Sequence, residues 1–165
     1  MASIKGIAGN QPITIVLEQT SVTRHVALTG TAGGIQLPDP ESILNDIEFY
    51  PLALPGLAPG TPAVIFFRTR HTGLPSFAVT LNNADVLYYT FTNADPPERT
   101  WHHIILPDLL PDSPTLMAEG NDLEFSIEFQ EGNTGTIIFG DIVIFYTSNE
   151  LTINTPVVIP PIEQL

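Results

Sequence analysis

Strict alternation of apolar and polar side chains is the feature that most narrows the fold of this chain. It is clearest in NDLEFSIEFQ, residues 121–130, where the apolar members are Leu123, Phe125, Ile127 and Phe129. Successive side chains of a β-strand point to opposite faces, so a period of two predicts a strand with one buried face and one solvent-facing face.

The same alternation predicts further strands. They cover residues 13–19, 22–29, 63–71, 76–81 and 85–92. Residues 82–84 and 131–135 carry the Asn and Gly that hairpin turns need for positive φ angles. The segment 136–147 is apolar on both faces, which predicts a central strand covered on both sides, with a bulge or a close approach at Gly140.

Short strands separated by turn signals about every ten residues predict an all-β fold. We expect a two-sheet antiparallel β-sandwich, jelly-roll-like, with little helix beyond a short turn over residues 41–45 that Asp39 can cap. An immunoglobulin domain fits less well, because its tryptophan lies between two cysteines and this chain has no cysteine. The expected organisation is one sandwich domain over residues 1–154 and a Pro-rich apolar C-terminal arm over residues 155–165.

Composition excludes several classes of function. The absence of cysteine rules out disulfides, cysteine metal sites and thiol catalysis. The formal net charge is −13, so nucleic acid and anionic lipid surfaces should be repelled. No signal peptide is visible, and no apolar run reaches the roughly 20 residues of a membrane-spanning helix. We expect a soluble protein, cytoplasmic or released without a visible signal, that does not insert into membranes.

Motifs for catalysis are missing from the sequence. No serine lies in a GxSxG elbow, and there is no glycine-rich phosphate loop. His102 and His103 are adjacent, so on a strand they point apart and cannot both bind one transition metal. We therefore expect no enzymatic activity and no cofactor. A small glycan-active enzyme stays open as a third choice, because carboxylate pairs that meet across strands leave no local spacing.

The stretch RTWHHIILP, residues 99–107, contains the only tryptophan of the chain. On an extended strand Arg99, Trp101 and His103 share one face. Trp101 then either packs in the core, or offers a flat face to a sugar ring with Arg99 and His103 donating hydrogen bonds beside it. The exposure of Trp101 decides between these two interpretations.

Two further groups are candidate ligand-binding residues. Arg68 and Arg70 share one strand face, where they either pair with acidic residues of a neighbouring strand or present donors to a ligand. His71 follows them, at the expected start of a loop. The third group surrounds the turn at residues 82–84 and consists of Asn82, Asp85, Tyr88 and Tyr89. Its two tyrosines should point to opposite faces, one in the core and the other exposed.

From Trp101 to Tyr146 the features follow in a fixed order: a tryptophan-led strand, a proline-rich loop, EGNDLEFSIEF, a turn and GTIIFGDIVIFY. This order resembles the C-terminal half of jelly-roll carbohydrate-binding modules and lectins, mainly over residues 99–147. The resemblance implies sugar binding through exposed aromatic residues. It also implies a structural calcium held by the aspartate of the last strand, here Asp141, although the N-terminal half lacks the Glu-x-Glu that often supplies the other ligands.

The expected function is a non-catalytic, lectin-like domain that recognises glycans through exposed aromatic and Arg, His and Asn side chains. The alternative is a structural self-assembly subunit of the capsid, tail or fibre type, for which jelly rolls are equally common. The C-terminal arm bears on this choice because it is strongly apolar. We expect it to dock, either on its own sandwich or on a neighbouring subunit of a homo-oligomer.

Overall fold

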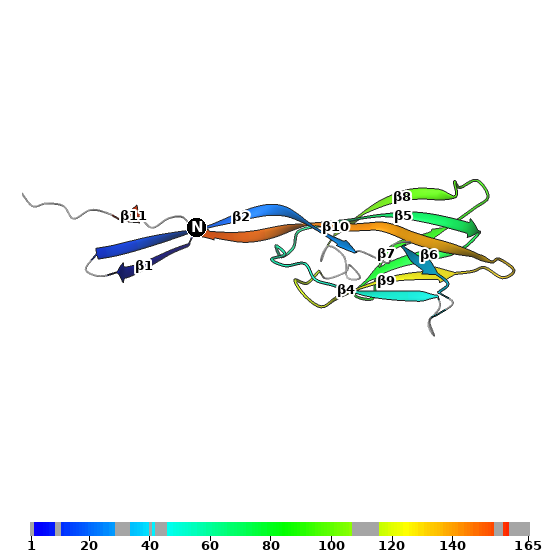
Figure 1. Ribbon diagram of the computed structural model, residues 1–165, viewed down its shortest axis with the longest axis horizontal. Coiled ribbons are helices and arrows are strands. Elements are labelled where there is room, and N and C mark those ends of the chain that lie inside the picture. Colours follow the sequence, from blue (N-terminus) through cyan, green and yellow to red (C-terminus); the bar gives the residue numbers. More distant parts are fainter. Residues whose placement is uncertain are drawn as a thin grey trace, which may run out of the picture.

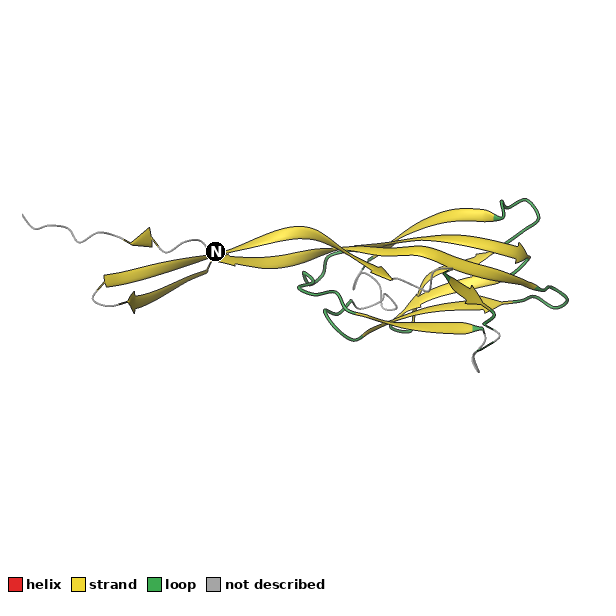
Figure 2. Ribbon diagram, in the orientation of Figure 1, coloured by secondary structure: helices red, strands yellow, loops and turns green. Residues whose placement is uncertain are grey.

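The computed structural model describes residues 2–8, 11–28, 34–39, 41, 46–106, 116–153 and 157–158. All regular structure within these ranges is β-strand, and they contain no helix (Figure 2). Two antiparallel sheets pack face to face as a sandwich, from which a narrow ribbon of strands extends (Figure 1). The predicted all-β, two-sheet antiparallel sandwich is therefore confirmed.

The larger sheet has the strand order β1-β2-β10-β5-β8, with β3 also beside β10 and β11 beside β2. Its strands are β1 (Ala2–Ala8), β2 (Gln11–Leu28), β3 (Ile35–Leu37), β5 (Ala63–Gly73), β8 (Glu98–Ile105), β10 (Gly135–Ile153) and β11 (Val157–Val158). The smaller sheet has the order β4-β9-β6-β7. Its strands are β4 (Ile47–Leu52), β6 (Ser76–Leu81), β7 (Ala84–Thr90) and β9 (Asn121–Glu128).

The strand pairs are nested in sequence. β3 pairs with β10, β4 with β9, β5 with β8 and β6 with β7, and every pair is antiparallel. The sandwich is thus one long hairpin, folded so that successive pairs alternate between the two sheets. Asn82 and Asn83 form its tip with φ angles of 52° and 63°, between the paired residues Leu81 and Ala84. This confirms the hairpin turn predicted there.

The second predicted hairpin turn, at residues 131–135, has a different role. It connects β9 of the smaller sheet to β10 of the larger sheet, so the two strands that it joins are not paired with each other. Gly132 has a φ of 82°, which fits the expected need for a positive φ angle. The Asn and Gly residues of this segment predict a turn of the chain. Which sheet the next strand joins depends on the pairing of distant strands, which these residues do not determine.

The core lies between the sheets and is rich in aromatic residues. Phe67 of β5 is 1% exposed, and its ring centroid lies 6.1 Å from those of Phe77, Phe125 and Phe139. The alternation in β9 is confirmed, because Leu123, Phe125 and Ile127 are buried. Aromatic side chains from both sheets therefore bind the two layers together.

β10 is the central strand of the larger sheet, as predicted, but it is not covered on both faces. Phe139 and Ile144 point inward and are fully buried, whereas Phe145 points outward and is 39% exposed. The described residues form no third layer over this outer face. The prediction that both faces of this strand are covered is therefore wrong for the outer face.

β2 is one continuous strand where two strands were expected over residues 13–19 and 22–29. It pairs with β10 from Leu28, opposite Ile142, to Leu17, opposite Ile153. β5 accompanies β10 only as far as Tyr146, so beyond this point β2 and β10 leave the sandwich together as a ribbon (Figure 1). Farther out, β1 and β11 flank β2. Within the predicted C-terminal arm, β11 is the described part.

Two smaller expectations concern helices. Asp39 Oδ1 accepts a hydrogen bond of 2.8 Å from the backbone N–H of Glu41, which is capping geometry. The rest of the predicted helical turn, residues 42–45, lies outside the described residues. In the part of the chain that the structure describes, no helix is long and apolar enough to cross a membrane.

At Gly73, one end of β5 approaches the backbone at the start of β10 too closely to leave room for a side chain. The φ of Gly73 is 68°, and an added Cβ would overlap the carbonyl oxygen of Thr134. We expect Gly73→Ala to lower the free energy of unfolding by about 2 kcal/mol or more in urea denaturation. Gly140→Ala is the matched control, because no atom lies within 4 Å of an added Cβ there. Equal losses of stability in the two variants would contradict this geometry.

Candidate functional site

Four charged side chains gather on the outer face of the larger sheet. Arg68 and Arg70 of β5 point outward, and the adjacent strands bring Glu98 of β8 and Asp141 of β10 beside them. Arg68 lies 3.2 Å from Glu98 and 2.9 Å from Asp141, whereas Arg70 lies 3.6 Å from Glu98. Both arginines therefore pair with acidic residues of neighbouring strands, which is one of the two alternatives predicted for them. We call these four residues the charged quartet.

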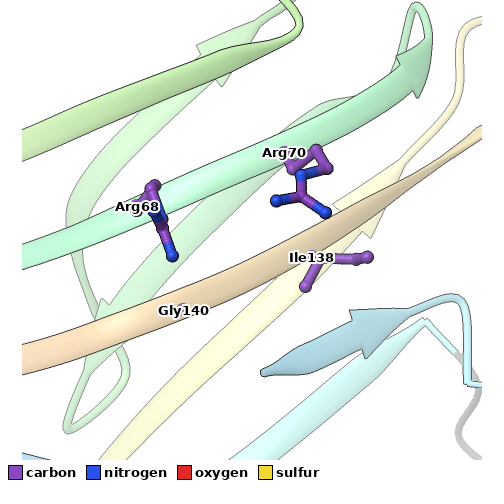
Figure 3. Close-up of a pocket in the computed structure, with 4 residues that line it drawn as sticks. All are labelled: Arg68, Arg70, Ile138 and Gly140. Carbon is purple, nitrogen blue, oxygen red and sulfur yellow. The ribbon is translucent and has the colours of Figure 1, made fainter. Parts of the chain in front are cut away.

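Two members of the charged quartet, Arg68 and Arg70, line a shallow hollow together with Ile138 and Gly140 (Figure 3). Figure 3 shows both arginine side chains rising from β5 beside the segment of β10 that carries Gly140 and Ile138. The hollow has a volume of about 60 Å³, much less than that of a pocket for a drug-sized ligand. A ligand would therefore lie across the sheet face and insert only one edge into the hollow.

A β-bulge in β10 shapes this hollow. The register between β10 and β5 shifts between Gly140 and Val143, which confirms the bulge predicted at Gly140. Two outward residues, Gly140 and Asp141, stand between the buried Phe139 and Ile142, where a regular strand would have one. Asp141 has a φ of 52°, and the bulge directs its carboxylate to Arg68. Gly140 meanwhile leaves the floor of the hollow without a side chain.

An aromatic row crosses the same outer face, one residue from each of four adjacent strands. The order is His25 of β2, Phe145 of β10, Phe66 of β5 and His102 of β8. Successive ring centroids lie 5.8, 5.6 and 6.0 Å apart, and Phe66 and Phe145 are 38% and 39% exposed. Phe66 is two residues from Arg68 on the same strand face, so the aromatic row runs beside the charged quartet.

Sequence reasoning selected Arg68 and Arg70 but missed Phe66, Phe145 and Glu98. Phe66 carries a local signal, because it alternates with Arg68 and Arg70 in IFFRTR. Phe145 lies in the strand that was expected to be covered on both faces. Glu98 joins the group only through the antiparallel register in which it faces Arg70, and no local pattern reports that register.

Trp101 is a core residue, which settles the question raised by the RTWHHIILP stretch. The side chain is 8% exposed, and its Nε1 donates a hydrogen bond of 2.7 Å to Thr69 Oγ1. The guanidinium carbon of Arg99 lies 4.3 Å from the ring centroid, and Phe67 stacks at 6.2 Å. His103 lies on the same, inward side of β8. The interpretation of Trp101 as an exposed platform for a sugar is therefore wrong.

Three predicted residues, Tyr89, Arg99 and Trp101, do come together, but they join the two sheets. Arg99 donates a hydrogen bond of 3.0 Å to the Tyr89 hydroxyl, which donates one of 2.7 Å to Asp95. The backbone N–H and hydroxyl of Thr92 donate to the other carboxylate oxygen of Asp95, each at 2.8 Å. Arg99 belongs to β8 and Tyr89 to β7, so this network closes one side of the sandwich.

The network shifts two pKa values. The hydrogen bond from Tyr89, followed by those from Thr92, holds the pKa of Asp95 below its ordinary value of 3.8. Donation to Asp95, together with burial, raises the pKa of the Tyr89 hydroxyl above its ordinary value of 10.0. Both shifts favour the state in which Asp95 is ionised and Tyr89 keeps its proton, so the network is intact at neutral pH.

The remaining predicted residues lie elsewhere. His71 ends the strand predicted over residues 63–71, but β5 continues to Gly73, so His71 does not begin a loop. It is 9% exposed and stacks on Phe91 with a centroid distance of 3.8 Å. Tyr88 is 56% exposed on the outer face of the smaller sheet, while Tyr89 is half-buried, which confirms that the two tyrosines point apart. Asp85 is exposed at the start of β7. The predicted ligand residues therefore do not form one site.

Asn82 has a structural partner, Asn121, the first residue of β9, which the sequence marks only by its position in a Gly-Asn pair. Asn121 is fully buried, and its Oδ1 accepts hydrogen bonds from Asn82 Nδ2 and the Met117 backbone N–H. Its Nδ2 donates to the carbonyl oxygens of Leu52 and Met117. This amide joins β4, the segment before β9 and the tip of the hairpin, so it serves the fold.

The calcium role that the resemblance implies for Asp141 has no support in the geometry. The carboxylate of Asp141 pairs with the cationic Arg68, which opposes binding of a second cation at the same oxygens. Within the described ranges, no group of three or more His, Cys, Asp or Glu residues could hold a metal ion. Asp141 thus belongs to the charged quartet.

No family model, curated protein or solved structure matches this chain.

Asp95 makes the stability of the sandwich depend on pH in a defined direction. Because its pKa is lowered in the folded state, its contribution is present above about pH 3.8 and is lost as the pH falls through the folded-state pKa. We expect Asp95→Asn to be less stable than the parent chain at neutral pH, with a difference that narrows in acid. Urea unfolding across this pH range measures the effect.

Asp85→Asn is the matched control, because Asp85 is an exposed carboxylate on the adjoining β7. At neutral pH its free energy of unfolding should equal that of the parent chain. A difference between Asp95→Asn and the parent chain that stays constant down to about pH 2 would contradict the role assigned to the ionised carboxylate.

Proposed function

We propose that this chain is a non-catalytic, lectin-like carbohydrate-binding domain whose binding surface is the outer face of the larger sheet. The observation that carries the proposal is the placement of two half-exposed phenylalanines, Phe66 and Phe145, beside the charged quartet. Aromatic rings pack against the apolar face of a sugar ring, while guanidinium and carboxylate groups exchange hydrogen bonds with its hydroxyls. Both kinds of group are present side by side on one rigid sheet.

Exposed apolar area on this face supports a role in binding. Ile104 of β8 is 55% exposed and adds to the area of Phe66 and Phe145. A chain with a net charge of −13 has ample polar residues to keep its surface solvated, so apolar side chains clustered on one sheet face favour a site of interaction. Of the ligand residues expected from the sequence, the proposed site keeps Arg68 and Arg70. Its aromatic contacts come from Phe66 and Phe145, because Trp101 is buried.

We further propose that the sandwich is a jelly roll. Four nested antiparallel pairs that alternate between two sheets are the pattern expected when a long hairpin rolls up into a double-sheet sandwich. This topology supports the resemblance to jelly-roll carbohydrate-binding modules. Fold alone does not determine function, however, so the proposal depends on the surface residues.

A glycan array tests the proposed function, and Phe66→Ala is the key variant. The parent chain should bind one class of glycans, and Phe66→Ala should weaken that binding by about fivefold or more, because aromatic contacts are worth about 1 kcal/mol each. Tyr88→Ala is the matched control, since Tyr88 is an exposed aromatic residue on the outer face of the other sheet. It should bind as the parent chain does.

Two results would contradict the proposal. A blank array for the parent chain, with and without calcium, would refute carbohydrate binding. Loss of binding in Tyr88→Ala together with full binding in Phe66→Ala would move the site to the smaller sheet and refute the assignment of the surface.

The ribbon favours a second candidate function, self-assembly. β2 and β10 leave the sandwich together, and Arg24 pairs with Glu150 across the ribbon, which also has a hydrogen bond of 3.0 Å from Ser21 to Asn149. Among the described strands, none covers the outer edge of β2 from residue 18 to residue 28. Two-stranded ribbons are marginally stable in water, and open edges pair readily with another chain. The ribbon therefore suits contact with further copies of this chain.

Solution mass tests this second candidate. If copies associate through the ribbon and the arm, light scattering on the full chain should give a multiple of 17.9 kDa. Removal of residues 155–165 should lower the mass toward that of one chain. A full-length variant that combines Val157→Ser, Val158→Ser and Ile159→Ser separates the loss of apolar contacts from the loss of length. We expect its solution mass to match that of the truncated chain. A full chain that already runs at 17.9 kDa would rule out assembly.

A further inference from the structure

We propose that the hollow over Gly140 binds a neutral hexose residue and discriminates against acidic sugars. This inference rests on the carbohydrate-binding function proposed above and adds the chemical class of the ligand. It follows from three properties of the charged quartet and the hollow: their balance of charge, their balance of donors and acceptors, and the open floor at Gly140.

The charge of the site is balanced. Arg68 and Arg70 supply two cations, and Glu98 and Asp141 supply two anions within 3.6 Å of them. An anionic ligand therefore meets no net local attraction, and at longer range it is repelled by a chain with a net charge of −13. A neutral ligand meets neither effect, so electrostatics favour an uncharged sugar.

Hydrogen-bonding groups in the site match hydroxyls better than they match a carboxylate. A guanidinium has five N–H donors, and an ionised carboxylate accepts at both of its oxygens. Arg70 is the more available donor, because its side chain is 64% exposed and its ion pair of 3.6 Å is the longest in the quartet. Asp141, whose side chain is 71% exposed, is the more available acceptor. A sugar hydroxyl both donates and accepts, so it can use the arginines as well as the carboxylates paired with them, whereas a ligand carboxylate only accepts and can use the arginines alone.

The shape of the hollow fits one edge of a pyranose ring. Its volume of about 60 Å³ accommodates a hydroxyl and its ring carbon more readily than a whole ligand. The adjacent aromatic row, through Phe66, can then contact the apolar face of the same or the next sugar residue. Gly140 keeps the floor open, because an added Cβ there would meet no atom within 4 Å and would project into free space. Any larger side chain at position 140 would occupy the hollow.

The experiment titrates the full-length protein with single sugars and follows binding by NMR or calorimetry. The probes are the methyl glycosides of glucose, galactose and mannose, and methyl glucuronide as their carboxylated counterpart. We expect at least one neutral glycoside to bind with a dissociation constant of about 1 mM, as is reasonable for a shallow site, and methyl glucuronide to bind at least about tenfold more weakly.

Three variants locate the site. Gly140→Val should fill the hollow and abolish binding without loss of stability, because its side chain enters open space. Arg70→Gln should weaken binding by about tenfold or more, since it removes charge-assisted donors. Arg24→Gln is the control, because Arg24 pairs with Glu150 on the ribbon, away from the hollow. It should bind as the parent chain does, and urea unfolding of each variant confirms that it is folded.

Each other outcome overturns a defined part of the account. Methyl glucuronide binding as tightly as the best neutral glycoside would refute the selectivity and leave carbohydrate binding intact. Unchanged binding in Gly140→Val would refute the location. Failure of all the methyl glycosides together with a positive glycan array would refute the hexose site alone, whereas failure of both would refute the proposed function as well.

Discussion

Backbone pairing along both edges of β10 is the constraint on which the rest of the structure depends. β2 and β3 pair with one edge and β5 with the other, so β10 belongs both to the sandwich and to the ribbon. The pairs β4–β9, β5–β8 and β6–β7 all lie between β3 and β10 in sequence. The register of the β3–β10 pair therefore constrains how these inner pairs align. The pairing with β5 slips once, at the bulge after Gly140, and this slip creates the hollow and directs Asp141 to Arg68.

Features that depend on a few neighbouring residues could be predicted from the sequence. The alternation in residues 121–128 became β9, and the two asparagines at 82 and 83 became the tip of the hairpin, because period-two burial and positive φ angles are local properties. The bulge at Gly140 has the same kind of signal, a glycine within a strand. The two-sheet sandwich follows from many such local signals, since strands with one apolar face must bury it against another layer.

Features that depend on register between distant strands could not be predicted. Phe66 and Phe145 are 79 positions apart in sequence, and they touch because β5 pairs with β10. The sequence leaves the role of Trp101 open because amphipathic aromatic side chains occur both in cores and in sugar sites, and only its burial against Phe67 and Phe77 decides between them. The exposure of the outer face of β10 could not be predicted because apolar outward residues have the same sequence pattern whether or not a third layer covers them.

The outer face of the larger sheet therefore joins the fold to the proposed function, and mapping ligand contacts residue by residue examines that link most directly. The measurement is the change in backbone amide NMR shifts as neutral methyl hexosides are added to the full-length protein. The account predicts changes centred on Gly140, Asp141 and Arg70, with smaller ones at Phe66 and little change in the smaller sheet. Changes centred on β4, β6, β7 or β9, or no changes at all at saturating sugar, would contradict it.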